Sequence, residues 1–307
     1  MSPAPRVLAW AAVAAVYLLM TLGNLVSATG SGLACPDWPL CHGRLIPPLE
    51  PDILIEYGHR LVAAFASILL VATIVTTLRR TSSAGIRRMG IVLLLLLGVQ
   101  IGLGGITVLL KLPHLISTAH LVNALLILGG LVMLAAPAMG ATQAVESGPA
   151  GAPQKLRRLA VAGLAVLLIQ LALGGYVRHS GAGLACPDFP LCGGELLPGH
   201  WLAVVHWIHR WLGVALLGLF VHLALAGRRT ALAPATWTVA ALAGLQVSLG
   251  ILTVLVRLDP SIRALHAAVG YALWGMLVWT SVGAAWQGVL AGGKRSARGL
   301  TEAARAS

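Results

Sequence analysis

The sequence predicts an all-α polytopic membrane protein whose eight transmembrane helices form two parallel-repeat four-helix bundles. Of the 307 residues, 58% are hydrophobic and only 10% are charged, whereas about 25% of a soluble domain is charged. A helix that crosses a bilayer needs about 20 apolar residues. The continuous apolar runs exclude the alternating pattern of a membrane β-barrel. Eight such stretches span residues 7–28, 57–78, 89–110, 115–138, 159–177, 203–226, 236–256 and 262–286.

The distribution of basic residues sets the orientation of these helices. With the N-terminus inside, 14 of the 21 Lys and Arg residues fall on inner segments and five on outer loops. The positive-inside rule then places both termini in the cytoplasm. We separately expect a multi-pass protein of the bacterial cell (inner) membrane. The net charge of +12 reflects this topology and attraction to anionic membrane lipid, not nucleic acid. No small-residue cleavage site directly follows the long first span, so we expect a retained helix.

A duplication divides the chain into two halves. The outer-loop sequence GLACPDWPLC at Gly32–Cys41 recurs as GLACPDFPLC at Gly183–Cys192, and Gly98–Leu112 in the third span matches Gly244–Leu258 in the seventh. Four spans return the chain to the side where it began, so the halves are parallel repeats related by an axis along the membrane normal. The predicted parts are an N-terminal half (1–145), a cytoplasmic linker (146–158), a C-terminal half (159–290) and a cytoplasmic tail (291–307).

All four cysteines lie in the repeated outer loops. Each copy contains one pair in the pattern C-x5-C, Cys35 with Cys41 and Cys186 with Cys192. The outer side of a bacterial membrane permits disulfides. Four cysteines allow three pairings, and the duplication favours pairing within each copy. The sequence contains no C-x-x-C redox motif, and both a structural bridge and a redox-active pair stay open.

Four of the ten histidines are distinguished by their position. His59, His120, His209 and His266 each lie within the first turns at the outer end of an even-numbered span, and each has a counterpart in the other half. Ionisable groups inside a membrane are costly and tend to mark function. Facing histidines from two helices of one bundle are a common way to hold a haem, whereas zinc would require three or four ligands. We therefore expect one haem site in each half and interpret the other histidines as solvated or packing residues.

The residue three positions before the histidine differs between the halves. Glu56 precedes His59 on the same helix face, while His206 holds the corresponding place before His209. A carboxylate there could act on a bound group, orient His59 or favour the helix N-terminus. The two sites are therefore not equivalent.

Further polar residues accompany the histidines. Arg60 and Arg210 follow the first histidine of each half directly, and each guanidinium could bind a haem propionate or extend to the membrane interface. The amides Gln100, Gln170 and Gln246 lie inside helices, where they serve helix packing or contact the edge of a cofactor.

This set of residues resembles the haem A synthase family, whose members convert haem O to haem A for terminal oxidases. The resemblance covers essentially the whole chain: eight spans, a four-plus-four repeat, paired outer-loop cysteines, and Glu-x-x-His followed by Arg in the second span. It implies an oxidoreductase that turns the porphyrin C8 methyl group into a formyl group. In the family this proceeds by successive hydroxylations, through an alcohol and a geminal diol that loses water.

The resemblance also implies a role for each site residue. His59 and His120 match the axial ligands of the substrate haem iron, as haem O or haem A, in the N-terminal half. His209 and His266 match the ligands of the iron of a permanent haem b in the C-terminal half. Glu56 matches the acidic residue required for activity, so chemistry is expected in the N-terminal half and electron transfer in the C-terminal half.

The loops and the partners follow the same resemblance. Cys35 and Cys41 match a pair associated with substrate handling or redox coupling, and Cys186 with Cys192 is typical of the bacterial type that carries cysteines in both loops. The expected partners are a haem O synthase as donor, terminal oxidase assembly factors and membrane lipid, and self-association into a homo-oligomer is a further expectation.

Three other functions share part of this pattern. A di-haem b membrane electron-transfer protein explains four histidines but does not call for Glu56. A quinone-linked thiol oxidase would need a C-x-x-C motif or an equivalent relay, and a solute transporter leaves the paired histidines without a purpose. The identity of the haems that co-purify with the protein discriminates among these functions.

Overall fold

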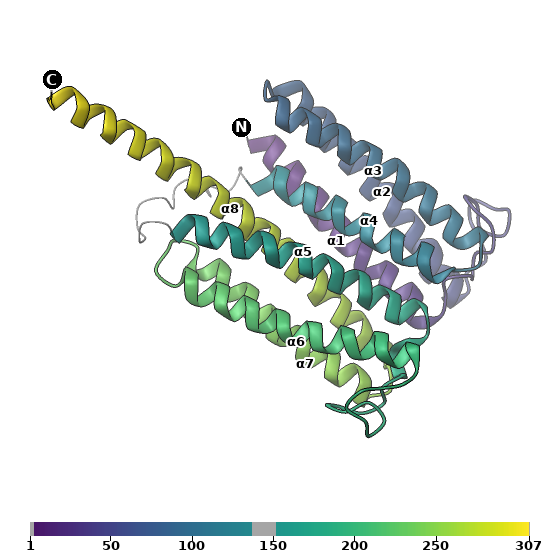
Figure 1. The fold of residues 1–307 in the computed structure, drawn as a ribbon. Helices are drawn as coiled ribbons and strands as arrows, with labels where there is room; N and C mark the ends of the chain where they lie inside the picture. Colours follow the sequence, from purple (N-terminus) through teal and green to yellow (C-terminus); the bar gives the residue numbers. More distant parts are fainter. Residues whose placement is uncertain (1–2, 137–151, 307) are drawn as a thin grey trace.

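The computed structural model describes residues 3–136 and 152–306 and consists of eight long helices (Figure 1). All eight are long and apolar enough to cross a membrane, which confirms the predicted all-α polytopic class. A 3-10 turn, η2 (Ala182–Leu184), precedes the sixth of them. The helices are α1 (Pro3–Thr29), α2 (Pro51–Arg80), α3 (Ala84–Leu109), α4 (His114–Ala135), α5 (Ala152–His179), α6 (Trp201–Gly227), α7 (Ala233–Leu255) and α8 (Pro260–Ala306).

Several helices extend beyond the apolar spans that the sequence predicts. α2 begins at Pro51 instead of 57, because a proline at the first position and Asp52 in the first turn suit a helix N-terminus although neither is strongly apolar. α5 begins at Ala152, inside the predicted linker, whose residues 146–151 lie outside the described part of the chain. α8 runs to Ala306 and so includes residues 291–306 of the predicted tail, whose last residue lies outside the described part of the chain. Hydropathy detects only the part of a helix that crosses the membrane.

Each half is a group of four helices that pack around a common centre. α1 and α3 each pack against both α2 and α4, and α5 and α7 each pack against both α6 and α8. α2 and α4 therefore stand diagonally across one bundle, as α6 and α8 do across the other. Figure 1 shows the two groups side by side, consistent with the predicted pair of four-helix bundles.

Helices α1, α4, α5 and α8 form the seam between the bundles. The Trp274 indole N–H on α8 donates to the Leu125 carbonyl oxygen on α4 at 2.7 Å, and the Tyr17 hydroxyl on α1 donates to the Ala268 carbonyl oxygen at 3.2 Å. Gly129 permits the close approach, since a Cβ there would lie 3.2 Å from Trp274 Nε1. Buried apolar side chains from both halves form one hydrophobic core across the seam.

The two cysteine loops lie at the end of the molecule opposite the start of α1 and the end of α8 (Figure 1). Disulfides join Cys35 to Cys41 and Cys186 to Cys192, with Cα–Cα distances of 4.7 Å and 4.4 Å. The pairing within each copy, which the duplication favours, is therefore confirmed.

An aspartate organises the turn in each loop. The Asp37 carboxylate accepts hydrogen bonds from the backbone N–H groups of His42 and Gly43, both at 2.7 Å. Asp188 accepts an equivalent pair of bonds in the other loop, at 2.6 Å and 2.9 Å. These backbone donors, Gly43 first among them for Asp37, hold the pKa of both carboxyl groups below the usual value. Both loops are therefore fixed by the same charged turn.

Candidate functional site

The four predicted histidines lie on the helices that stand diagonally across each bundle, near the ends that carry the loops. His59 on α2 and His120 on α4 are close enough to interact electrostatically, and so are His209 on α6 and His266 on α8. Diagonal helices do not pack directly against each other, so each pair faces the interior of its bundle. The structure thus brings together the residues that the sequence predicted as pairs.

Glycines on α1 and α5 make room for the first histidine of each pair. A Cβ at Gly23 would lie 2.8 Å from Cε1 of His59, and a Cβ at Gly174 would lie 2.7 Å from Cε1 of His209. Since Cβ atoms essentially never approach so closely, any larger residue would displace the imidazole. Gln170 of α5 adds a bond from its Nε2 to the His209 carbonyl oxygen at 2.8 Å, so this glutamine braces the helix that carries the ring.

The second histidine of the N-terminal pair also packs on a glycine and contacts an amide. A Cβ at Gly104 would lie 3.2 Å from Cε1 of His120. One turn earlier on α3, Gln100 Nε2 lies 3.3 Å from His120 Nε2. Asn123 of α4 fixes this glutamine, because its Nδ2 donates to Gln100 Oε1 at 2.7 Å and to the Leu96 carbonyl oxygen at 2.9 Å. The amide network orients the edge of the ring.

The equivalent environment of His266 lacks the asparagine. A Cβ at Gly250 would lie 3.2 Å from Cε1 of His266, and Gln246 Nε2 lies 3.3 Å from His266 Nε2. Val269 stands where the repeat would place a partner for the glutamine, and Gln246 Oε1 is buried without a hydrogen bond. The sequence left helix packing and contact with a cofactor edge open for Gln100 and Gln246, and the structure adds that both amides lie against a histidine.

All four histidine rings have a buried Nδ1 atom without a hydrogen-bond partner. Buried polar atoms are nearly always paired, so these imidazoles fit a site completed by a ligand. Within the described residues, no three His, Cys, Asp or Glu side chains gather in a way that could hold a bare metal ion. Two facing histidines suffice for the iron of a haem, which brings its own equatorial ligands. The residues present in each half therefore fit a haem.

Glu56 links the disulfide loop to the helix that carries His59. Glu56 is 3% exposed, and its Oε2 accepts a hydrogen bond from the Cys35 N–H at 2.7 Å. Its Oε1 forms a salt bridge with Arg60 Nη2, also at 2.7 Å. The Arg60 guanidinium further donates to the carbonyl oxygens of Cys35, Asp37 and Leu40 at 2.9, 2.8 and 2.6 Å. The carboxylate is thereby fixed in position from both sides.

The second half repeats the arginine but not the carboxylate. Arg210 donates to the carbonyl oxygens of Cys186, Asp188 and Leu191 in its own loop. Its Nε donates to Nε2 of His206 at 3.1 Å, where the first half has an ion pair. His206 is 4% exposed and its Nδ1 has no partner. The two halves therefore share a loop anchor and differ in the buried group beside it.

The sequence reading missed the glycines behind the histidines, although the repeat contains a signal for them. Gly23 and Gly174 are separated by the same 151 residues as Cys35 and Cys186. It also missed Asn123, which has no counterpart in the other half and so gives no repeat signal. For Arg60 and Arg210, the structure shows carbonyl groups of the loop around each guanidinium, which the sequence did not predict.

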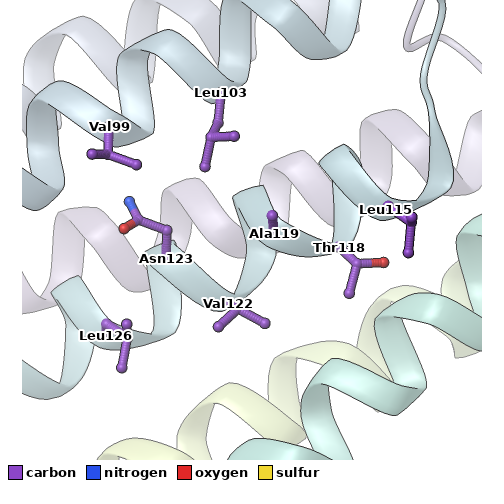
Figure 2. Close-up of a pocket in the computed structure, with 8 residues that line it drawn as sticks. All are labelled: Val99, Leu103, Leu115, Thr118, Ala119, Val122, Asn123 and Leu126. Atoms are coloured by element: carbon purple, nitrogen blue, oxygen red, sulfur yellow. The ribbon is translucent and has the colours of Figure 1, made fainter.

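A groove of about 440 Å³ lies on the outside of the N-terminal bundle, between α3 and α4 (Figure 2). Val99 and Leu103 of α3 line one side, and Val122, Asn123 and Leu126 of α4 line the other. Figure 2 shows the Asn123 amide between the two helices. This amide connects the groove to the glutamine beside the second histidine. The groove is thus separate from the interior histidine pair but adjoins its amide network.

Comparison with known proteins identifies the family. Residues 6–278 match the family described as cytochrome oxidase assembly protein, COX15-CtaA. The chain belongs to this family. It is similar to a protein of Symbiobacterium thermophilum named heme A synthase, with 32% identity over 285 residues, 89% of this chain and 92% of the relative. Proteins of the same name from Lysinibacillus sphaericus and Rhizorhabdus wittichii are each 28% identical, over 89% and 92% of this chain and 94% and 95% of their own.

Proposed function

We propose that this protein is a haem A synthase, a membrane oxidoreductase that oxidises a methyl group of haem O to a formyl group and so makes haem A. The observation that carries the proposal is the match over nearly the whole chain to relatives named heme A synthase. Two histidine pairs, each backed by glycines and with unpartnered Nδ1 atoms, support it because they suit haem.

In this proposal the halves have different tasks. His59 and His120 bind the iron of the substrate haem in the N-terminal half, and His209 and His266 bind the iron of a resident haem b in the C-terminal half. The buried carboxylate of Glu56 supports this division, because it provides the N-terminal half with an acid–base group one turn from the first histidine.

The task of Glu56 follows from its charge and position. Oxidation of a methyl group develops positive charge at that carbon, and a nearby carboxylate can stabilise this charge or accept a proton. Arg60 and the Cys35 N–H hold the two carboxylate oxygens in place, so the group is oriented before the substrate arrives. His206 offers no fixed negative charge in the other half. When bound, haem b supplies the redox chemistry of iron.

The arginines hold the cysteine loops against the helices that carry the histidines. From the sequence, Arg60 and Arg210 either bind a haem propionate or extend to the membrane interface, and we propose that they serve the haem mainly by holding the loops in place. Each guanidinium joins three loop carbonyl groups to the helix that carries His59 or His209. Each disulfide closes the same loop, so bridge, arginine and histidine form one rigid unit.

We further propose an orientation and partners that agree with this activity. Both termini lie in the cytoplasm, which is supported by the basic residues of the inner segments. Haem O carries an apolar tail, so it would pass within the membrane from a haem O synthase, and the product would pass to terminal oxidase assembly factors. A homo-oligomer in the membrane is part of the same proposal.

The haems that co-purify with the protein test this function. In cells that make haem O, mass and absorbance should identify haem b together with haem O or haem A, and haem A should accumulate only when the protein is present. Two identical haems b without haem A would instead establish the alternative, a di-haem b electron-transfer protein.

A further inference from the structure

The outer rims of the two histidine pairs carry different charges. We define a rim position as a residue one helical turn nearer the disulfide loops than a reference residue. On α2, α4, α6 and α8 the reference residue is the histidine of the pair. On α1 and α5 it is the glycine that packs on a histidine. Residues three or four apart share a helix face, so each rim residue lies on the same face as the histidine or glycine that defines it. The rim residues are Ser27, Glu56 and Ser117 in the N-terminal half, and Arg178, His206 and Arg263 in the C-terminal half.

Arg263 forms the rim above His266. It lies three residues before this histidine on α8, and its Nη1 is 3.5 Å from the Ala28 carbonyl oxygen at the end of α1. In the N-terminal half the same place, three residues before His120, is taken by Ser117. The Ser117 hydroxyl is buried and without a partner. A cation in one half thus corresponds to a small hydroxyl group in the other.

Arg178 forms the rim above His209. It follows Gly174, which packs on the His209 ring, by one turn of α5. Its Nε donates to Ser27 Oγ at 3.0 Å, and its Nη2 donates to the Asn24 carbonyl oxygen at 2.6 Å. Ser27 is also the residue that corresponds to Arg178 in the N-terminal repeat. Here too a guanidinium in the C-terminal half corresponds to a serine in the N-terminal half.

The two guanidiniums form a cationic pair without a carboxylate. Arg178 and Arg263 are electrostatic neighbours, and neither forms a salt bridge with a carboxylate of the described residues. The carbonyl groups at the end of α1 supply partial negative charge, which does not equal two full charges. Partly buried like charges are costly unless an anion pairs with them. The site is therefore suited to a ligand with two carboxylates.

We propose that Arg178 and Arg263 bind the propionate carboxylates of the haem held by His209 and His266, and that the N-terminal half lacks this anchor. This inference rests on the proposed function. A guanidinium presents paired N–H donors that match a carboxylate, and a haem has two propionates. A resident cofactor is thereby retained. The N-terminal half itself supplies only Ser27 and Ser117 at these positions, and Arg178, which donates to Ser27, is engaged by the C-terminal haem in this proposal, so the substrate can leave after reaction.

A haem without carboxylates provides the test. In a His120→Ala background, which removes a ligand of the N-terminal site, the protein is reconstituted with haem b or with haem b dimethyl ester. Transfer of each to excess apomyoglobin in detergent gives a dissociation rate. We expect the ester to leave about tenfold to hundredfold faster than haem b, the effect of losing a charged hydrogen bond. Equal rates would overturn the proposal.

The arginine variants show which residues cause the difference. In Arg263→Gln and in Arg178→Gln, haem b should leave about tenfold faster, while the rate for the ester should hardly change. Arg263→Gln is the milder change, because the hydrogen bond of Arg263 to α1 is 3.5 Å long. A variant that speeds both haems equally would indicate a merely structural role and would overturn the proposal for that arginine. Ser117→Arg in a His266→Ala background is the reciprocal variant, and it should slow haem release from the N-terminal half.

The outcome separates the anchor from the proposed function. A bis-histidine absorbance spectrum of bound haem b reports ligation by His209 and His266 whether or not the arginines contact propionates. If haem b binds with this spectrum but dissociates as fast as its ester, only the proposed contact of the arginines with the propionates is refuted. If the protein binds no haem at His209 and His266, the assignment of the C-terminal haem site itself is refuted.

Discussion

Replacement of Glu56 by glutamine tests the proposed chemistry most directly. The substitution keeps the size of the side chain and an oxygen that can accept from the Cys35 N–H, but it removes the ion pair with Arg60 at 2.7 Å. Arg60 keeps its three bonds to loop carbonyl groups, so its charge is not left unpartnered. We therefore expect a loss of about 2 kcal/mol in stability, the range of one hydrogen bond to a charged group, and an intact fold.

The effect of Glu56→Gln on the reaction should be much larger than its effect on folding. Loss of a positioned acid–base group typically reduces a rate by about 10²- to 10⁴-fold. Haem O should still bind, since His59 and His120 are unchanged, while haem A falls by orders of magnitude. Haems extracted from cells that supply haem O, separated and identified by mass, give the ratio of haem A to haem O.

The equivalent change in the other half provides the control for Glu56→Gln. His206→Gln alters the corresponding buried residue and its contact with Arg210, but it should reduce haem A far less if chemistry belongs to the N-terminal half. A normal yield of haem A in Glu56→Gln would refute the role of the carboxylate. Equal losses in both variants would refute the division of tasks between the halves.

Three further predictions address the ring packing, the disulfide and the loop. Gly23→Ala should displace the His59 ring, because the new Cβ would lie 2.8 Å from Cε1, and should lower haem content in the absorbance spectrum; Gly58→Ala, which meets no atom within 4 Å, is the matched control. Cys35→Ser should cost about 2 kcal/mol of stability by opening a short loop, measured by thermal unfolding in detergent, and an unchanged melting temperature would contradict this. The lowered pKa of Asp37, caused first by the Gly43 N–H, gives stability that is present above the unfolded value of 3.8 and is lost as pH falls through the folded value. Asp37→Asn should therefore lower the melting temperature at neutral pH and have no effect once the wild-type carboxyl is protonated, and a constant difference at all pH values would contradict it.

The sequence predicted the features that repeat and the residues whose chemistry is costly in a membrane. The length of the apolar stretches predicted eight helices. The repeat predicted the disulfide pairs and the histidine pairs, because both are visible as patterns along the sequence. Contacts between residues that are distant in the sequence produce no such pattern. Arg60 follows a histidine in the sequence, but only the fold places three carbonyl groups of a distant loop around it. Asn123 and Arg178 were overlooked because neither has the same residue type at its repeat position.

The bonds across the seam have a consequence for the origin of the two halves. A protein that arose from a symmetric dimer would have an interface in which each contact occurs twice. Here Trp274 donates to Leu125, but Leu128 stands at its repeat position, and Arg178 donates to Ser27 and Asn24 without a reciprocal pair. The contacts between the two halves are therefore not symmetric. The chain is thus comparable to a covalent heterodimer, in which the two halves are always present in equal number and in fixed orientation.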